Sequence, residues 1–251
     1  MNILVCVKRV PLTGGKMVLT DDQRAISTRH LGFTVSPHEE CGVEEAVRLI
    51  EQHGGSSAVL TLGPPEAEEQ LRDMMALGID RAIHLVTDGE EWDPQATAQA
   101  ITEAVQTEPE PYDLILFGNE SADAGNYQVA IRVAHKLGLP VVTGIKGITV
   151  SGNQLLCEHE VTGGRDVYVV PTPAAVTVKE GINLPRYPSV PGRLRAKRKP
   201  LTSSTPQRPE PKLEMVKLTL PPGSGKQAEV LGNGADAAPA VVTLLDEMGL
   251  L

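Results

Sequence analysis

Two hydrophobic periods alternate over the first 145 residues, and this alternation is the feature that most constrains the fold. Short and nearly continuous apolar runs are typical of strands that are buried on both faces. Longer segments, in which apolar residues recur three and four positions apart, are typical of helices with one buried face. The runs lie at 2–7, 57–62, 81–86, 113–117 and from 141 onward, and the helical segments at 39–52, 64–77, 94–105 and 127–137.

This alternation predicts an α/β fold with a doubly wound, mainly parallel sheet of the Rossmann-like, adenine-nucleotide-binding kind. The ligand of such a fold binds beyond the carboxyl ends of the strands. The segments that we expect at this edge are 8–15, 36–39, 63–64, 88–93 and 118–126.

The pattern changes after residue 147. Three segments, 147–150, 155–161 and 167–170, predict a small antiparallel addition, because glycine-containing turns separate them. A buried strand follows at 174–178, and the proline-rich segment 181–212 carries a basic cluster at 193–199, which indicates an extended arm. An amphipathic helix is expected at 237–248. We therefore expect a nucleotide-binding domain at 1–180, including the hairpin 147–170, and a C-terminal arm with its helix at 181–251.

Composition narrows the classes of function. The formal net charge of −9 argues against a nucleic-acid-binding protein, which needs a positive face for phosphates. No run of 18 apolar residues and no signal-peptide pattern is present, so we expect a cytoplasmic protein without a membrane-inserted segment. The three widely spaced cysteines fit reduced thiols rather than a disulfide frame or a zinc site.

The segment 118–128 is the strongest local indication of a ligand. It follows a predicted strand and opens a predicted helix, where unpaired N–H groups favour an anion such as phosphate. Gly118 and Gly125 would allow a close backbone approach. An ordinary loop, in which Asp123 and Asn126 serve as helix caps, is the alternative interpretation.

Two other patterns carry less information about function. The segment 223–226 has the Gly-Ser-Gly-Lys order of a phosphate-binding loop, but Leu220 and Gln227 stand where that motif requires Gly and Ser or Thr. We expect a flexible turn there. No histidine or cysteine spacing indicates a metal or Cys–His catalytic site, and His38 is the one histidine expected at the ligand edge.

Several segments, in their order and spacing, resemble the beta subunit of electron transfer flavoproteins over nearly the whole chain. They include Ile-Leu-Val-Cys-Val-Lys-Arg-Val-Pro at 3–11, Ser-Pro-His-Glu-Glu-Cys-Gly-Val-Glu-Glu-Ala at 36–46, and Ala-Leu-Gly-Ile-Asp-Arg-Ala at 76–82. The most specific is Asn-Leu-Pro-Arg-Tyr-Pro-Ser-Val-Pro at 183–191, which continues into Ala-Lys-Arg-Lys at 196–199.

The resemblance implies a non-catalytic electron-carrier subunit in a heterodimer. An alpha subunit would hold most of the redox FAD, and this chain would hold an AMP and wrap its arm around that partner. Electrons would come from flavin dehydrogenases such as the acyl-CoA dehydrogenases of fatty acid oxidation. They would leave to a quinone oxidoreductase.

Residue by residue, the resemblance also implies two sites. The residues expected to bind the nucleotide are Cys6, Ser36, Pro37, His38, Glu39, Leu62, Gly63, Gly118, Asp123, Gly125, Asn126, Tyr127, Gln128 and Val129. The residues expected to recognise a partner are Asn183, Pro185, Arg186, Tyr187, Val190, Pro191 and Arg195, with Val190 at the position of the family's anchoring leucine.

Some positions depart from the family pattern and keep alternatives open. Asn119 and Glu120 stand where a basic residue and Gln are usual, and Val129 replaces a frequent Thr, as in a subset that binds a second FAD. That subset splits electron pairs from NADH. A stand-alone adenine-nucleotide sensor of the universal-stress type is another alternative, although a sensor has no need of a long arm.

Overall fold

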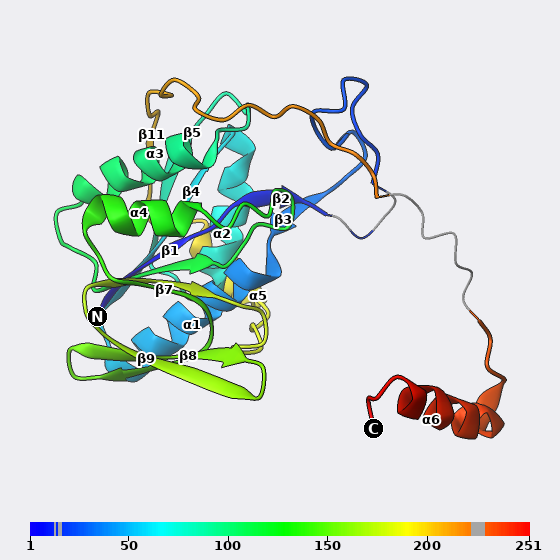
Figure 1. Cartoon of the computed structure of the whole chain (residues 1–251). Coiled ribbons are helices and arrows are strands. Elements are labelled where there is room, and N and C mark those ends of the chain that lie inside the picture. The colour runs from blue at the N-terminus through cyan, green and yellow to red at the C-terminus, as the bar shows by residue number, and fades with distance from the viewer. Residues whose placement is uncertain (13, 15–16, 222–228) are drawn as a thin grey trace. The chain divides into compact units, whose positions relative to one another are not determined.

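The structure is a computed structural model that describes residues 1–12, 14, 17–221 and 229–251 (Figure 1). Contacts divide the chain into two compact units, Met1–Val216 and Lys217–Leu251. The predicted turn at 223–226, and positions 13 and 15 of the predicted edge segment 8–15, lie outside the described residues.

The first unit is built around a mixed, mainly parallel sheet. Within the described residues its nine strands lie in the order β11-β5-β4-β1-β6-β10-β7-β8-β9. Neighbours run parallel from β11 to β7, and β7, β8 and β9 run antiparallel. The predicted fold class is therefore confirmed. The strands are β1 Asn2–Cys6, β4 Ser56–Gly63, β5 Arg81–Val86, β6 Leu114–Gly118, β7 Val141–Ser151, β8 Gln154–Val161, β9 Gly164–Pro171, β10 Ala174–Val178 and β11 Leu201–Ser204.

Helices cover both faces of this sheet, as Figure 1 shows. Side chains alternate along β1, so that Ile3 and Val5 face one core and Leu4 and Cys6 face the other. The first core is shared with α1 and α2, and the second with α3 and α4. The helices are α1 Pro37–His53, α2 Glu68–Leu77 after a 3₁₀ turn η1 at Pro65–Ala67, α3 Pro94–Gln106 and α4 Val129–Leu137.

Three pieces of regular structure lie outside the predicted elements. Strands β2 (Arg9–Pro11) and β3 (Phe33–Val35) form an antiparallel ribbon, in which the Arg9 guanidinium lies 3.3 Å from the centre of the Phe33 ring. Helix α5 (Val190–Ala196) and strand β11 lie within the proline-rich arm. Strand β11 pairs with β5. The part of the arm up to residue 216 belongs to the first compact unit.

The second unit contains a 3₁₀ turn η2 at Gly234–Ala237 and helix α6 at Ala238–Glu247. No residue of α6 is buried among the described residues. None of the described helices in either unit is long and apolar enough to cross a membrane.

The strand order fixes where a ligand can bind. From β1 the chain builds outward through β4 to β5 on one side, and then returns to place β6 on the other side of β1. The loops that leave β1 and β6 therefore diverge, which opens a crevice at the carboxyl ends of these two strands.

Candidate functional site

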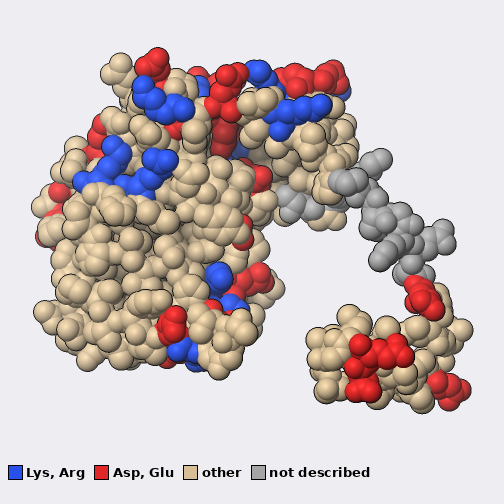
Figure 2. All heavy atoms as spheres, viewed as in Figure 1, with Lys and Arg blue, Asp and Glu red and all other residues tan. Residues whose placement is uncertain are grey.

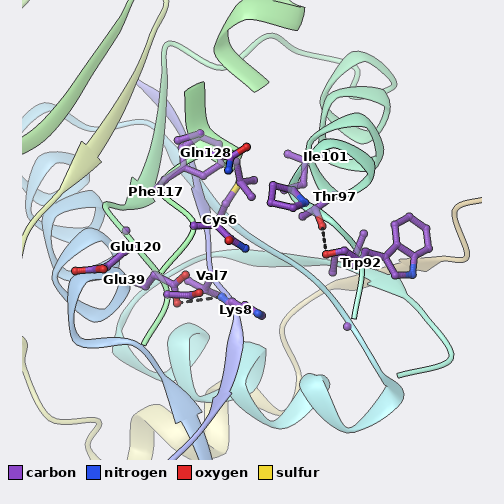
Figure 3. A pocket seen from close by; sticks show the side chains of 18 of the residues that line it. Cys6, Val7, Lys8, Glu39, Trp92, Thr97, Ile101, Phe117, Glu120 and Gln128 are labelled. Atoms are coloured by element: carbon purple, nitrogen blue, oxygen red, sulfur yellow. Dashed lines mark hydrogen bonds between the residues drawn. The ribbon is translucent and has the colours of Figure 1, made fainter. Parts of the chain in front are cut away.

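A cavity of about 250 Å³ lies at the carboxyl ends of β1 and β6, where the strand order reverses (Figure 3). One part of its wall is apolar, with side chains from the strands and from α3, and includes Cys6, Ile101 and Phe117. The other part is polar and comes from the loop after β1, the first turn of α1 and the loop 118–128. A mixed wall of this kind is typical of small-molecule sites.

The first turn of α4 borders this cavity without a side-chain cap. The Gln128 side chain, at the N-cap position, instead accepts hydrogen bonds from Arg132, at 3.2 Å from Nε and 2.9 Å from Nη2. The Arg132 N–H donates the first helical hydrogen bond, to the Gln128 carbonyl, so the N–H groups of residues 129–131 have no acceptor within the helix. These three residues line the cavity. The helix start can therefore receive an anion by its N–H groups and its dipole.

Glu39 forms another part of the wall and is almost completely buried. Its Oε2 atom accepts the N–H of Lys8 at 3.0 Å and the N–H of Ser36 at 3.4 Å. A Cβ at Gly118 would lie 2.5 Å from the Glu39 Cγ atom, so the end of β6 requires glycine for this side chain to fit. Burial raises the pKa of Glu39 to about 8, against the opposing effect of the two N–H bonds. Near neutral pH the carboxyl group is therefore mostly uncharged.

Lys8 joins two loops beside the cavity. Its Nζ atom lies 2.7 Å from the Glu91 carboxylate, in the loop before α3, and 2.8 Å from the Asp123 carboxylate, in the loop before α4. Burial alone would lower the pKa of Lys8, but the two carboxylates outweigh it and hold this pKa above its ordinary value. The three charges thus leave one net negative charge rather than two.

A second hollow, of about 460 Å³, lies between the start of α1 and the loop 120–125. The His38 Nδ1 atom accepts the N–H of Glu180 at 2.7 Å, and its Nε2 atom lies 3.5 Å from Glu120 Oε1. The Ser36 hydroxyl accepts the N–H of Ala122 at 3.0 Å. These contacts tie the α1 start to the loop after β6.

The residues predicted to bind a nucleotide divide between the two hollows. The first cavity is lined by Cys6, Glu39, Leu62, Gly63, Gly118, Asn126, Tyr127, Gln128 and Val129. The second is lined by Ser36, Pro37, His38, Asp123 and Gly125. Gly125 has φ of 55°, and a Cβ there would meet only Glu120 Oε2 at 3.5 Å. Backbone conformation, rather than lack of room, is therefore what requires glycine at 125.

Sequence reasoning did not single out several residues of the first cavity. Trp92 and Thr97 come from the end of the segment 88–93 and from α3, and the unique tryptophan within a predicted edge segment was an available signal. Thr177 gave no such signal, because it lies in a buried strand. Its hydroxyl accepts the Gly144 N–H at 2.7 Å and donates to Asn119 Oδ1 at 2.9 Å.

The residues predicted to recognise a partner lie in the turn after β10 and in α5. Asn183, Pro185 and Arg186 are partly buried, whereas Tyr187 and Val190 are 95% and 73% exposed. Pro191 and Arg195 are also exposed.

The described residues contain no group of three or more His, Cys, Asp or Glu side chains placed to hold a metal ion. Burial raises the pKa of the Cys6 thiol, and it raises that of Cys157 to about 11. Neither thiol is therefore a thiolate nucleophile near neutral pH.

Comparison with known proteins identifies a family for this chain. Residues 25–208 match the family model described as the electron transfer flavoprotein domain. The chain is 34% identical to the electron transfer flavoprotein subunit beta of Bacillus subtilis, over 98% of this chain and 97% of that one. It is 35% identical to the subunit beta of Syntrophomonas wolfei over 88% and 86% of the two chains, and 32% identical to that of Bradyrhizobium diazoefficiens over the whole of both.

The family model covers the elements from β3 to β11, including the turn that carries Tyr187 and Val190, but not β1. The match to the Bradyrhizobium subunit covers the whole chain and so also includes the part of the cavity wall that follows β1. The chain belongs to the electron transfer flavoprotein family, as a subunit of the beta type.

Proposed function

We propose that this chain pairs with an alpha subunit and binds AMP in the cavity at the carboxyl ends of β1 and β6, while the alpha subunit holds most of the FAD that carries electrons. The observation that carries this proposal is the uncapped start of α4, which faces an apolar wall across one cavity. An adenosine monophosphate has the same division into an anionic end and an aromatic end.

The charges around the cavity are compatible with a phosphate. The N–H groups of residues 129–131 would donate hydrogen bonds to it, and the side-chain amide of Asn126 would add a donor. The raised pKa of Glu39 removes one negative charge at neutral pH, and Lys8 offsets one of the two charges of Asp123 and Glu91. The adenine ring would lie against the apolar side chains from β1, β6 and α3.

The electron chemistry belongs to the flavin, and this chain contributes binding and orientation. We propose flavin dehydrogenases, such as acyl-CoA dehydrogenases, as the source of the electrons and a quinone oxidoreductase as their destination. The surface that would meet the dehydrogenase is the turn after β10 with α5, which exposes Leu184, Tyr187, Val190 and Leu194.

Helix α6 supports the pairing with another subunit. Val241, Leu244 and Met248 are 41%, 41% and 63% exposed, and they recur at helical spacing on one face. Residues 229–251 contain no Lys or Arg, and Figure 2 shows acidic and uncharged side chains on the visible face of this segment. A partner surface that is apolar with a basic rim would complement it. Burial of these three side chains and of Leu245, which lies on the same face, would stabilise a complex by about 6–10 kcal/mol before entropic costs.

The test is the identity of the ligands released from the purified heterodimer. The chain is co-expressed with its alpha subunit, and mass spectrometry of the denatured complex should find one AMP and one FAD. Two FAD and no AMP would replace the AMP proposal by the electron-splitting alternative. A stable, colourless monomer that does not bind the alpha subunit would overturn the subunit proposal.

A variant locates the AMP. Val129→Glu adds a carboxylate at the start of α4 and should abolish AMP retention with FAD unchanged, because two anions would then share one site. Val18→Glu adds the same charge at an exposed loop position and serves as the matched control. Full AMP retention in Val129→Glu would show that the phosphate lies elsewhere.

A further inference from the structure

The turn 184–190 and the first part of α5 expose apolar side chains to an unusual extent. Leu184 is 85% exposed and Leu194 is 61% exposed, in addition to Tyr187 and Val190. Exposed apolar clusters of this kind mark interaction sites. The affinity that such a cluster provides depends on whether the backbone that carries it is ordered before a partner binds, because ordering on binding costs conformational entropy.

Arg186, at the centre of this turn, is bound to α1 by five hydrogen bonds. Its N–H and Nε donate to Glu44 Oε2 at 3.1 and 2.8 Å, and its Nη2 donates to Glu44 Oε1 at 3.1 Å. Its Nη1 and Nη2 also donate to the Glu51 carboxylate, at 2.7 and 2.9 Å. The two carboxylates are seven residues apart on α1 and so lie on the same face. The planar guanidinium group matches this arrangement, which an ammonium group cannot reproduce.

The Glu44 side chain is only 3% exposed, and this burial makes the contact with Arg186 hard to release. A buried carboxylate that loses its cationic partner is strongly destabilising. Because the same carboxylate also accepts the backbone N–H of Arg186, the backbone of the turn is fixed together with the side chain.

Both ends of the turn are held as well. The Asn183 side chain donates to the Cys41 carbonyl at 3.0 Å and to Glu45 Oε2 at 2.8 Å. At the other end, a Cβ on Gly192 would lie 2.7 Å from the Ala76 carbonyl oxygen, so α5 rests directly on the end of α2. The apolar side chains thus project from a base that is anchored on two helices.

We propose that Arg186 is a positioning residue, which uses the buried Glu44 carboxylate to lock the turn 184–190 in one conformation before a partner enzyme binds. This inference rests on the proposed function, because the locked side chains are those that would meet the dehydrogenase. An ordered turn loses less conformational entropy on docking than a mobile one.

The lock is tested without any partner enzyme. Heterodimers that carry Arg186→Ala or Arg186→Lys are compared with wild type in the amide hydrogen exchange of residues 183–189, apart from Pro185 and Pro188, which carry no amide hydrogen. We expect exchange to accelerate at least about tenfold in Arg186→Ala, and by a smaller factor in Arg186→Lys. Arg48→Ala is the matched control, because Arg48 binds the same Glu44 carboxylate at 3.0 Å and, among the described residues, makes no hydrogen bond or ion pair with the turn.

The positioning role has its own measurement. Electron transfer is followed from an acyl-CoA dehydrogenase reduced with octanoyl-CoA to each heterodimer. Arg186→Ala should raise the KM for the heterodimer about tenfold, which corresponds to about 1.4 kcal/mol, with kcat changed less than twofold. The FAD content of each heterodimer should match that of wild type, so that a changed KM is not the result of lost flavin.

Each outcome decides the proposal. Amide exchange in Arg186→Ala equal to that of wild type would show that Arg186 does not hold the turn in one conformation. Faster exchange with an unchanged KM would overturn the positioning role. If the wild type accepts no electrons from this dehydrogenase, the donor class in the proposed function is wrong, whereas the exchange results still show whether Arg186 holds the turn.

Discussion

Asp93 joins the start of α3 to the backbone of Lys212 by its two carboxylate oxygens. Oδ1 accepts the N–H groups of Gln95 and Ala96, both at 2.8 Å, and so caps the helix. Oδ2 accepts the N–H of Lys212 at 2.7 Å and that of Leu213 at 3.4 Å. Nearby, Arg208 Nη2 donates to the Glu91 carbonyl at 2.7 Å. The arm is therefore fastened to the loop that forms one wall of the cavity.

The two oxygens of Asp93 can be separated by mutation. Asp93→Asn retains one carbonyl oxygen for the helix cap but replaces the other oxygen by an amide donor, which cannot accept from Lys212. We expect the melting temperature to change little and trypsin cleavage after Lys212 to accelerate, whereas Arg208 is followed by proline and is no trypsin site. Asp93→Ala should add the loss of the cap, about 1 kcal/mol of unfolding free energy. Equal protease resistance in Asp93→Asn and wild type would contradict this assignment.

Gly118→Ala should disturb the contact between β6 and the start of α1. The new methyl group would overlap the Glu39 Cγ atom, and overpacking of this kind costs about 1–3 kcal/mol. We expect a lower melting temperature of the heterodimer and reduced AMP content. Gly164→Ala is the matched control, because a Cβ at that position meets no atom within 4 Å and needs no left-handed backbone. Wild-type stability and AMP content in Gly118→Ala would show that the α1 start yields freely.

Glu39→Gln should change the pH dependence of stability. The native state holds the Glu39 proton up to a pKa of about 8, whereas the unfolded chain releases it near pH 4.5. Between these values the unfolded state binds fewer protons, so the unfolding free energy of the wild type falls as pH rises. Gln does not titrate, and its single oxygen can still accept both N–H bonds, since both reach Oε2.

The expected advantage of Glu39→Gln over wild type grows by roughly 3–5 kcal/mol from pH 4.5 to above pH 8, at 1.36 kcal/mol per pKa unit. Urea unfolding of the two heterodimers at pH 5, 7 and 9 measures this difference. Parallel stability curves would mean that Glu39 ionises in the native protein as it does in water.

Leu244→Asp should weaken the pairing with the alpha subunit. Leu244 lies on the apolar face of α6 with Val241 and Met248, and a charge there would have to be desolvated at the interface. Val242→Asp places the same charge outside this face, at a residue that is 54% exposed. Analytical ultracentrifugation of the co-expressed subunits should show dissociation in the first variant alone. Equal dissociation constants for the two would exclude this face as the contact.

The sequence predicted the elements whose pattern is set by their own burial. Strands such as β1 are buried on both faces, so continuous apolar runs identify them without knowledge of their neighbours. The helices α1, α3 and α4 each bury one face, and that produces the helical period.

Elements that depend on a distant neighbour were not predictable in this way. Strand β11 reads Leu-Thr-Ser-Ser and lies at an exposed edge, so its only strand signal is its pairing with β5. Helix α5 contains Pro191 and Gly192 within seven residues, and it is held by the Ser189 cap and by contact with α2. Strands β2 and β3 are three residues each and are separated in the sequence by more than twenty residues.

The loops at the ligand edge were predictable as loops, but their mutual contacts were not. Glu39 reads as a first-turn carboxylate until the fold places it against Gly118. Arg186 and Glu44 are 142 residues apart, and no local pattern links them. The division of the predicted nucleotide residues between two hollows likewise follows from the path of the loop after β6, which local sequence does not encode.

The parallel pairing of β11 with β5 also determines when the sheet can be completed during translation. The β5 edge stays unpaired while the ribosome makes the whole stretch from α3 to α5, since its last neighbour begins at Leu201. The residues beyond β11 emerge only after that neighbour is available. A nascent chain can therefore offer its C-terminal helix to another subunit only once every strand of its own sheet has been translated.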